Sequence, residues 1–548
     1  MTSTDCPSSE EVGRASNRSW PVILLVLGLA AAVAFSLLPA LFAPVSADDR
    51  YWSLETPARY GSYAELVVGT WEDNAAFVDV GRVSTLGRLA RRLVHKAVFD
   101  VARLTSTSIV NPIGGVKLAL LLAAAAASLA FVKSLRWRAS DGRLIRVGRA
   151  SLLVVGTMLM ALLAGGVQTH AQFRNGWVSY APHTYLAIAI IFGTAGASVV
   201  LARRVADRMP AAVPTAVGVS ILFAVIWNWT YELNYMALPL AVFAVVVFPL
   251  TSEKRRVDER RARLIAGGSL IGSWLTIFAA TRAYLSGVCT GDECYVGTTL
   301  SLGPDIFSTW WFNLASSLPG TSGAVFTEDL DRLGMSHLWS QGTPGQLWVV
   351  SLALSLCLAG VWLWASRRWP VPEGNRGAER SLLLRGALGS FGVGLGAALI
   401  MSLSAQSQEV ISTIGLPYRH TVLTWAAIAL TVALVGRAIQ LSSTRSARLV
   451  AIGTVIVLVF IASVYTLPRN LVSTQAYRIE PGNRAIADVH FEVVAGDLSN
   501  DGHERRCHAF ERAETHVHNR WVTQRLEPAA DVLFRRLHGE AFCGTSQP

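Results

Sequence analysis

The 548-residue sequence contains few charged residues. Asp, Glu, Lys and Arg make up 16% of the chain, whereas hydrophobic residues make up 52% and the mean hydropathy is +0.41. Soluble domains usually carry about 25% charged residues. The composition therefore excludes an ordinary soluble domain and indicates a protein that lies in a lipid bilayer.

Motifs that mark several large protein classes are also absent. The sequence has no Walker loop, no glycine-rich dinucleotide fingerprint, no HExxH and no nucleophile elbow, so ATP-driven transport, hydride transfer and zincin-type proteolysis have no support. Its apolar segments contain almost no ionisable residues away from their ends. This disfavours an ion-coupled carrier, because such carriers generally need charged groups inside the membrane.

Apolar runs long enough to cross about 30 Å of hydrocarbon recur along the chain. We predict an all-α polytopic membrane protein with about eleven transmembrane helices. The expected spans are 20–43, 117–133, 150–167, 184–202, 211–229, 236–250, 264–285, 346–365, 386–404, 420–437 and 448–466.

The distribution of basic residues predicts the orientation, because Lys and Arg near span ends stay on the cytoplasmic side. Segments such as 133–149 and 252–263 are rich in arginine. The outer loops expected at 168–183, 230–235, 286–345 and 405–419 hold three basic residues between them, Arg174, Arg332 and Arg419. The net charge of +11 is therefore a topology signal and requires no nucleic acid partner.

This topology predicts three parts. Residues 1–19 form a cytoplasmic N-terminus, residues 20–466 form the transmembrane domain with a long first outer loop at 44–116, and residues 467–548 form a small external C-terminal segment. The scarcity of lysine beside many arginines is typical of high-GC bacteria, so we expect the protein in a bacterial plasma membrane. The lysines are Lys96, Lys117, Lys133 and Lys254.

A signal peptide is the alternative interpretation of the first apolar run. Val45, Ser46 and Ala47 resemble a signal-peptidase site, and cleavage there would remove the first span. The run of roughly 24 apolar residues is longer than the usual signal core of 7–15 residues. We therefore expect a retained helix.

Four cysteines lie in segments that we expect outside the cytoplasm, where disulfides persist. Cys289 and Cys294 fall in one outer loop, and Cys507 and Cys543 fall in the C-terminal segment. We predict both local pairs to be disulfides. The C-terminal segment is expected to begin with a strand at 486–494 and to form a solvated cap or an acceptor-binding element. Its histidines, His503, His508, His516 and His518, are a weaker candidate for a metal site.

The first outer loop contains an acidic pair and an amphipathic helix. Asp48 and Asp49 follow directly on the first apolar run. Residues 81–104 have apolar side chains at helical spacing, with basic side chains largely off that stripe. Such a helix either lies in the membrane interface and attracts anionic headgroups or packs over the span ends with a solvated basic face.

The chain resembles the GT-C superfamily of integral membrane glycosyltransferases in four features. These are an acidic pair just after the first span, a long first outer loop with an amphipathic helix, many spans of modest polarity, and an external C-terminal segment. That resemblance implies a first-loop carboxylate that acts as a base or as a ligand of a divalent metal, Mg or Mn. It also implies a polyprenyl-phosphate-linked sugar donor that is used on the outer face, with a glycan acceptor. Only Asp48 and Asp49 match the family's motif, and we predict Asp49 as the base or metal ligand.

Further residues are expected on the same face of the membrane. We predict that cationic side chains stabilise the departing donor phosphate and that Glu232 forms an acceptor or second acidic site. The phosphate-binding candidates are Arg174, Arg282, Arg419 and His420.

Two other functions fit the topology. An O-antigen-type polysaccharide polymerase or ligase would depend on Arg174, Arg419 and His420 and would not need the aspartates. A non-catalytic membrane protein or lipid-linked glycan flippase would tolerate changes at every outer carboxylate.

Overall fold

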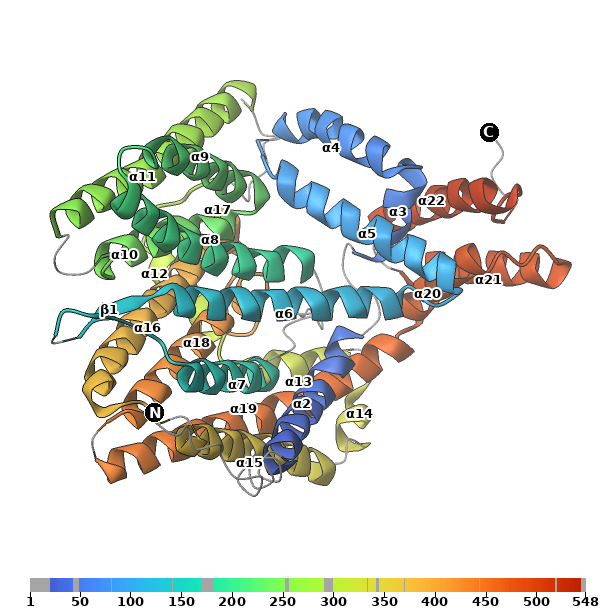
Figure 1. Ribbon diagram of the computed structural model, residues 1–548. Helices are drawn as coiled ribbons and strands as arrows, with labels where there is room; N and C mark the ends of the chain where they lie inside the picture. The colour runs from blue at the N-terminus through green and yellow to red at the C-terminus, as the bar shows by residue number, and fades with distance from the viewer. Residues whose placement is uncertain are drawn as a thin grey trace, which may run out of the picture.

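The computed structural model describes residues 20–42, 49–79, 81–139, 141–166, 168, 181–251, 256–289, 299–332, 334–341, 344–368, 370–442, 444–517 and 520–543. Within these ranges the chain is almost entirely helical (Figure 1). One hairpin, β1 (Arg136–Arg138) and β2 (Leu144–Arg146), is the sheet in this part of the chain. A polytopic helical architecture is therefore confirmed.

Nine of the described helices are long and apolar enough to cross a membrane. They are α6 (Val110–Ser134), α7 (Arg149–Gly166), α8 (Ala181–Arg208), α9 (Val213–Thr230), α11 (Arg256–Val288), α15 (Pro344–Arg368), α16 (Glu373–Ser402), α18 (Thr421–Gln440) and α19 (Arg445–Ile479).

The two remaining expected spans, 20–43 and 236–250, each contain one helix, of 22 and 11 residues respectively. The first is α2 (Trp20–Leu41), and the second is α10 (Ala237–Val247), which follows the 3₁₀ turn η2 (Glu232–Met236). At 1.5 Å per residue, the 11 residues of α10 extend about 17 Å, so α10 alone does not reach across the hydrocarbon. The shorter helices of the bundle are α12 (Asp305–Ala315), α13 (Gly323–Arg332), α14 (Ser336–Gln341) and α17 (Ala405–Val410).

The spans share one hydrophobic core, whose largest fully buried side chains include Trp227 and Trp362. Close packing is helped by small residues. For example, a Cβ atom at Gly166 would lie 1.7 Å from the Trp425 indole nitrogen, so this position of α7 admits only glycine against α18.

A second core lies at the end of the bundle away from β1 (Figure 1). It joins helices of the first loop with helices of the C-terminal segment, through residues such as Tyr51, Leu54, Phe99, Leu526 and Phe534. The helices in this region are α3 (Asp49–Arg59), α4 (Tyr63–Val78), α5 (Thr85–Thr105), α20 (Pro481–Ala495), α21 (Asn500–His516) and α22 (Arg520–His538). Two segments more than 370 residues apart therefore form a single unit, called the cap here.

The strand expected at 486–494 is wrong, because these residues lie in α20. Ile486, Val489, His490 and Val493 are buried, which is the i, i+3, i+4, i+7 spacing of one helix face. Glu480 accepts a hydrogen bond from the Asn483 amide and caps the helix start. The apolar residues of this short run fit both the two-residue period of a strand and the 3.6-residue period of a helix. Packing against the rest of the cap stabilises the helix.

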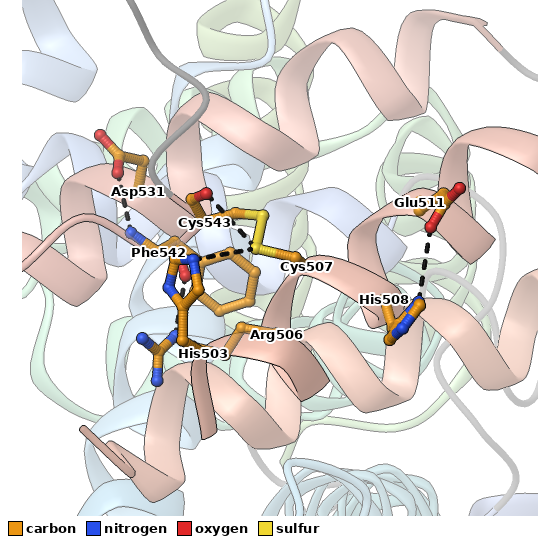
Figure 2. The surroundings of a disulfide bond; sticks show 8 residues. All are labelled: His503, Arg506, Cys507, His508, Glu511, Asp531, Phe542 and Cys543. Carbon is orange, nitrogen blue, oxygen red and sulfur yellow. Dashed lines mark hydrogen bonds and ion pairs between the residues drawn. A yellow bond between two sulfur atoms is a disulfide. The ribbon is translucent and has the colours of Figure 1, made fainter. Parts of the chain in front are cut away.

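The predicted disulfide between Cys507 and Cys543 is present and ties α21 to the segment that follows α22 (Figure 2). Arg506 donates to the Phe542 carbonyl at 2.7 Å, and Asp531 accepts from the Phe542 amide at 2.9 Å. Closing a loop of this length stabilises a fold by about 4 kcal/mol in the chain-entropy model. The same segment is thus fastened both covalently and by hydrogen bonds.

The other cysteine and histidine predictions have mixed outcomes. Cys289 is disulfide-bonded, and Cys294 lies outside the described residues. His508 pairs with Glu511, and His503 contacts the Cys507 sulfur (Figure 2). Among the residues that the structure describes, no three His, Cys, Asp or Glu side chains are close enough together to hold a metal ion.

Candidate functional site

A cationic cavity of about 490 Å³ lies between the cap and the ends of the spans. Its walls come from α3, α4, α5, α8 and α22, together with residues next to α9 and α18. Seven arginines line it, whereas Glu55 is the one carboxylate among the described lining residues. The arginines are Arg59, Arg82, Arg88, Arg91, Arg92, Arg419 and Arg525.

Helix α5 turns its basic side chains towards this cavity. Arg88 and Arg92 line the cavity and are 4% and 8% exposed, whereas Val101 and Leu104 on the apolar stripe are 45% and 78% exposed. A helix therefore covers most of the segment predicted at 81–104, as α5 (Thr85–Thr105), and the face that carries Arg88 and Arg92 is buried beside the cavity. The physical reason is that α3 and α4 cover this face and supply aromatic and acidic partners.

Asp73 of α4 neutralises part of this charge. It forms an ion pair with Arg92 at 2.8 Å, another with Arg59, and accepts a hydrogen bond from the Tyr60 hydroxyl at 2.5 Å. Burial and this hydrogen bond raise the pKa of Tyr60 to about 12, so the phenol stays protonated and keeps donating. The three helices α3, α4 and α5 are thereby locked together around one carboxylate.

Arg88 is not compensated in this way. Neither of its terminal nitrogens, Nη1 and Nη2, has a hydrogen-bond partner among the described residues, although both are buried. Its guanidinium lies 2.9 Å from the centre of the Phe77 ring, a cation–π contact. Burial and, to a smaller extent, the positive charges of Arg82, Arg91 and Arg92 together lower the pKa of Arg88 to about 8. A buried cation with free donors that lines a cavity has the chemistry to bind an anion.

The C-terminal segment closes the cavity on the α3 side. Arg525 of α22 lies 3.4 Å from the Glu55 carboxylate. Arg536 donates hydrogen bonds of 2.9 Å to the carbonyls of Pro57 and Ala58, near the end of α3 where helical carbonyls lack intrahelical partners. The C-terminal segment is thus a part of the cavity wall and not a separate domain.

Arg536→Ala is expected to loosen the cap. Two carbonyls lose their donors, which we expect to lower the free energy of unfolding by about 1–3 kcal/mol. Arg535 is the matched control, because it pairs with Asp531 on its own helix, and Arg535→Ala should change stability by less than about 0.5 kcal/mol. Hydrogen exchange of residues 49–59 measures the effect, and equal protection in the two variants would show that Arg536 does not fasten α22 to α3.

An apolar cleft of about 450 Å³ adjoins the cationic cavity. Tyr235 packs edge-on against Trp274 and Phe278, whose rings stack at 4.7 Å, and all three line the cleft together with aliphatic residues of α11 and α16. Its described lining is shared with the cationic cavity at Arg82, Tyr231 and Arg419. The two spaces are therefore direct neighbours, one charged and one apolar.

The predicted site residues fall in different places. Asp48 and Arg174 lie outside the described residues. Asp49 is the first residue of α3, whose later turns line the cationic cavity, but its side chain lies outside the described part of the chain.

The remaining predicted residues are described. Arg419 lines both spaces, whereas Arg282 and Glu232 line the apolar cleft. Glu232 lies 3.8 Å from Arg82 in a half-exposed ion pair. His420 is 1% exposed and its Nε2 atom contacts the Asn313 carbonyl at 3.0 Å. His420 is therefore part of the span packing, and it lines neither space.

Sequence reasoning missed Glu55, Arg525 and the special position of Arg88. The signal for Glu55 is its helical spacing from other cavity residues of α3, because it lies three residues from Trp52 and four residues from both Tyr51 and Arg59. No local signal exists for Arg525, because only the docking of α22 on α3 brings it to Glu55.

Comparison of the chain with models of protein families, with curated proteins and with solved structures gives no match. The site therefore has to be interpreted from its own chemistry.

Proposed function

We propose that this protein is an integral membrane glycosyltransferase that moves a sugar from a polyprenyl-phosphate donor to an envelope glycan or glycolipid acceptor. Buried Arg88, with unpaired guanidinium donors lining a cationic cavity next to an apolar cleft, is the observation that carries the proposal. We place the chain in a bacterial plasma membrane with about eleven spans, a cytoplasmic N-terminus and the cap on the extracytoplasmic side.

The shape and charge of the site match an amphipathic lipid phosphate. The aromatic and aliphatic walls of the cleft take part of an isoprenoid chain, and the hydrophobic effect favours this burial at about 25 cal/mol per Å². Arg82 and Arg419 lie where the two spaces meet. The phosphate of the donor then falls within reach of guanidinium groups, whose paired N–H donors suit phosphate oxygens.

The transfer reaction needs a base and a stabilised leaving group. An acceptor hydroxyl oxygen attacks the anomeric carbon, the bond between that carbon and the phosphate oxygen breaks, and the electron pair leaves with the phosphate. A carboxylate takes the hydroxyl proton, for which we retain Asp49, with Asp48 beside it. Arg88 and its neighbours stabilise the phosphate as its negative charge grows.

A divalent metal remains part of the proposal only through the aspartates. The described part of the cavity offers Glu55, which is paired with Arg525, and the nearby Asp73, which is paired with Arg59 and Arg92. These engaged carboxylates do not make a metal site. A Mg or Mn ion would therefore depend on Asp48 and Asp49, and it would supply further positive charge to the leaving phosphate.

The proposal predicts selective binding of polyprenyl phosphate. Purified full-length protein in nanodiscs should bind undecaprenyl phosphate at least about tenfold more tightly than undecaprenol, because hydrogen bonds to a charged group contribute roughly 1.5–3 kcal/mol. Thermal stabilisation by each lipid measures the difference. Equal stabilisation by undecaprenyl phosphate and undecaprenol would contradict a phosphate-binding function. It would mean that the apolar cleft alone binds the lipid.

A further inference from the structure

A second group of arginines lies at the opposite end of the bundle, around the hairpin labelled β1 (Figure 1). Arg136 is directly opposite Arg146 in the antiparallel register. Residues opposed in this way share one face of the sheet, with Cβ atoms about 5 Å apart, and like charges there destabilise the pair. Arg203 of α8 adds a third guanidinium, which donates to the carbonyl of Ser134, two residues before Arg136.

The positive charge of this group is only partly balanced. Arg203 is 7% exposed, and neither its Nε atom nor that of Arg136 has a hydrogen-bond partner among the described residues. Burial lowers the pKa of Arg136, and Arg146 lowers it further, while Asp207 acts in the opposite direction. Asp207 is the one carboxylate that acts on both Arg136 and Arg203.

Other arginines of the same hairpin have a carboxylate partner of their own, although the Nε atom of Arg138 also has no hydrogen-bond partner among the described residues. Arg138 forms an ion pair with Glu259 and donates to the Thr251 carbonyl at 3.1 Å. Arg143 pairs with Asp141 at 2.5 Å. The fold thus supplies carboxylate partners to some arginines of the hairpin, whereas Asp207 is the one described carboxylate that acts on the guanidinium groups of Arg136 and Arg203 together.

The hairpin holds its arginines in place. Trp137, on the opposite face of the strand, packs against the main core, and the Arg385 guanidinium lies 4.0 Å from its ring centre. The group also stands where spans end, because Ser134 closes α6 and Arg203 lies in the last two turns of α8. This is the level at which the phosphates of lipid headgroups lie.

We propose that Arg136, Arg146 and Arg203 form a binding site for the phosphate of an anionic membrane phospholipid. The phosphate oxygens accept hydrogen bonds from the guanidinium groups and relieve the repulsion between Arg136 and Arg146. The acyl chains extend along the ends of α6 and α8. This site is separate from the cationic cavity, and it does not depend on the proposed glycosyltransferase function.

Native mass spectrometry of the full chain with phosphatidylglycerol and phosphatidylcholine tests the site. Each arginine beside an anionic lipid contributes about 1 kcal/mol, or about fivefold in affinity. The double variant Arg136→Gln/Arg146→Gln should therefore bind phosphatidylglycerol about 30-fold more weakly than the wild type. Arg143→Gln, a change in the same hairpin, should leave the affinity within twofold.

The melting temperature provides a second readout, because the double variant is expected to lose lipid affinity without losing stability. Without anionic lipid the double variant should melt at the same temperature as the wild type or higher, because a repulsive pair is removed. Phosphatidylglycerol should stabilise the wild type and not the variant. Should the double variant fold poorly, the exposed single change Arg146→Gln carries the same test with about a fivefold effect.

Three results would overturn the proposal. They are equal binding of the two lipids by the wild type, equal loss of affinity in the Arg143 control and the double variant, and displacement of the lipid by millimolar inorganic phosphate. The last result would mean that the arginines hold a free phosphate rather than a lipid headgroup.

Discussion

Arg88→Ala is expected to weaken the binding of undecaprenyl phosphate by about 10- to 100-fold. The estimate follows from the loss of charge-assisted hydrogen bonds, which contribute roughly 1.5–3 kcal/mol in a buried site. Arg88→Lys should have an intermediate affinity, because it keeps the charge and loses the planar pair of donors. Titration of the lipid into wild-type and variant protein in nanodiscs measures the effect.

Two further measurements separate binding from folding at Arg88. Arg103→Ala removes a basic residue from the exposed end of the same helix, and it should leave the affinity within twofold. Arg88→Met should not lower the melting temperature of the lipid-free protein, because a buried cation without hydrogen-bond partners is removed. Unchanged lipid affinity in Arg88→Ala, at normal stability, would remove the main support for the proposed function.

The pH dependence of this stability effect has a defined sign. In the folded protein the pKa of Arg88 is lowered to about 8, below the ordinary arginine value. The cost of keeping Arg88 charged is therefore complete below about pH 8 and becomes smaller as the pH rises above it. Accordingly, Arg88→Met should raise the melting temperature more at pH 7 than at pH 9.5.

Asp49→Asn is expected to decrease sugar transfer by a factor of about 10² to 10⁴, which is the usual contribution of a general base. Lipid binding should change by less than about threefold, because the donor phosphate is held by arginines. Asp48→Asn and Glu55→Gln belong in the same series, since Glu55 is the carboxylate seen in the described cavity wall. The envelope glycans of cells that carry each variant, at equal protein level, give the transfer readout.

The pattern across this series decides between mechanisms. Glu72→Gln is the control, because Glu72 is exposed on α4. If only Glu55→Gln is inactive, the base lies one to two turns further along α3 than we propose. If all three acidic variants leave the glycans unchanged while Arg419→Ala alters them, an O-antigen-type polymerase or ligase replaces the glycosyltransferase. Unchanged glycans in every variant would favour a non-catalytic role.

Much of the architecture could be predicted because hydrophobic run length is a local property. A run of about 20 apolar residues must satisfy its backbone hydrogen bonds within itself, so it forms a helix wherever it lies. Nine expected spans appear as such helices. The helix expected at 81–104 appears as α5 because its period of 3.6 is also local.

Short segments were harder to predict, as α20 shows. Its residues 486–494 place apolar side chains at positions that fit the strand pattern and the helix pattern almost equally. The contacts of Ile486 and Val489 with the rest of the cap resolve that ambiguity.

The sequence by itself determined a polytopic helical architecture and predicted that the first loop and the tail carry the functional residues. Only the tertiary structure decided that these two segments form one cap, that the basic face of α5 points inwards, and that Arg525 meets Glu55. The physical reason is that charge pairing and desolvation depend on distances between residues far apart in the chain. Asp73 forms an ion pair with Arg92, whereas the terminal nitrogens of Arg88 on the same helix face have no hydrogen-bond partner among the described residues.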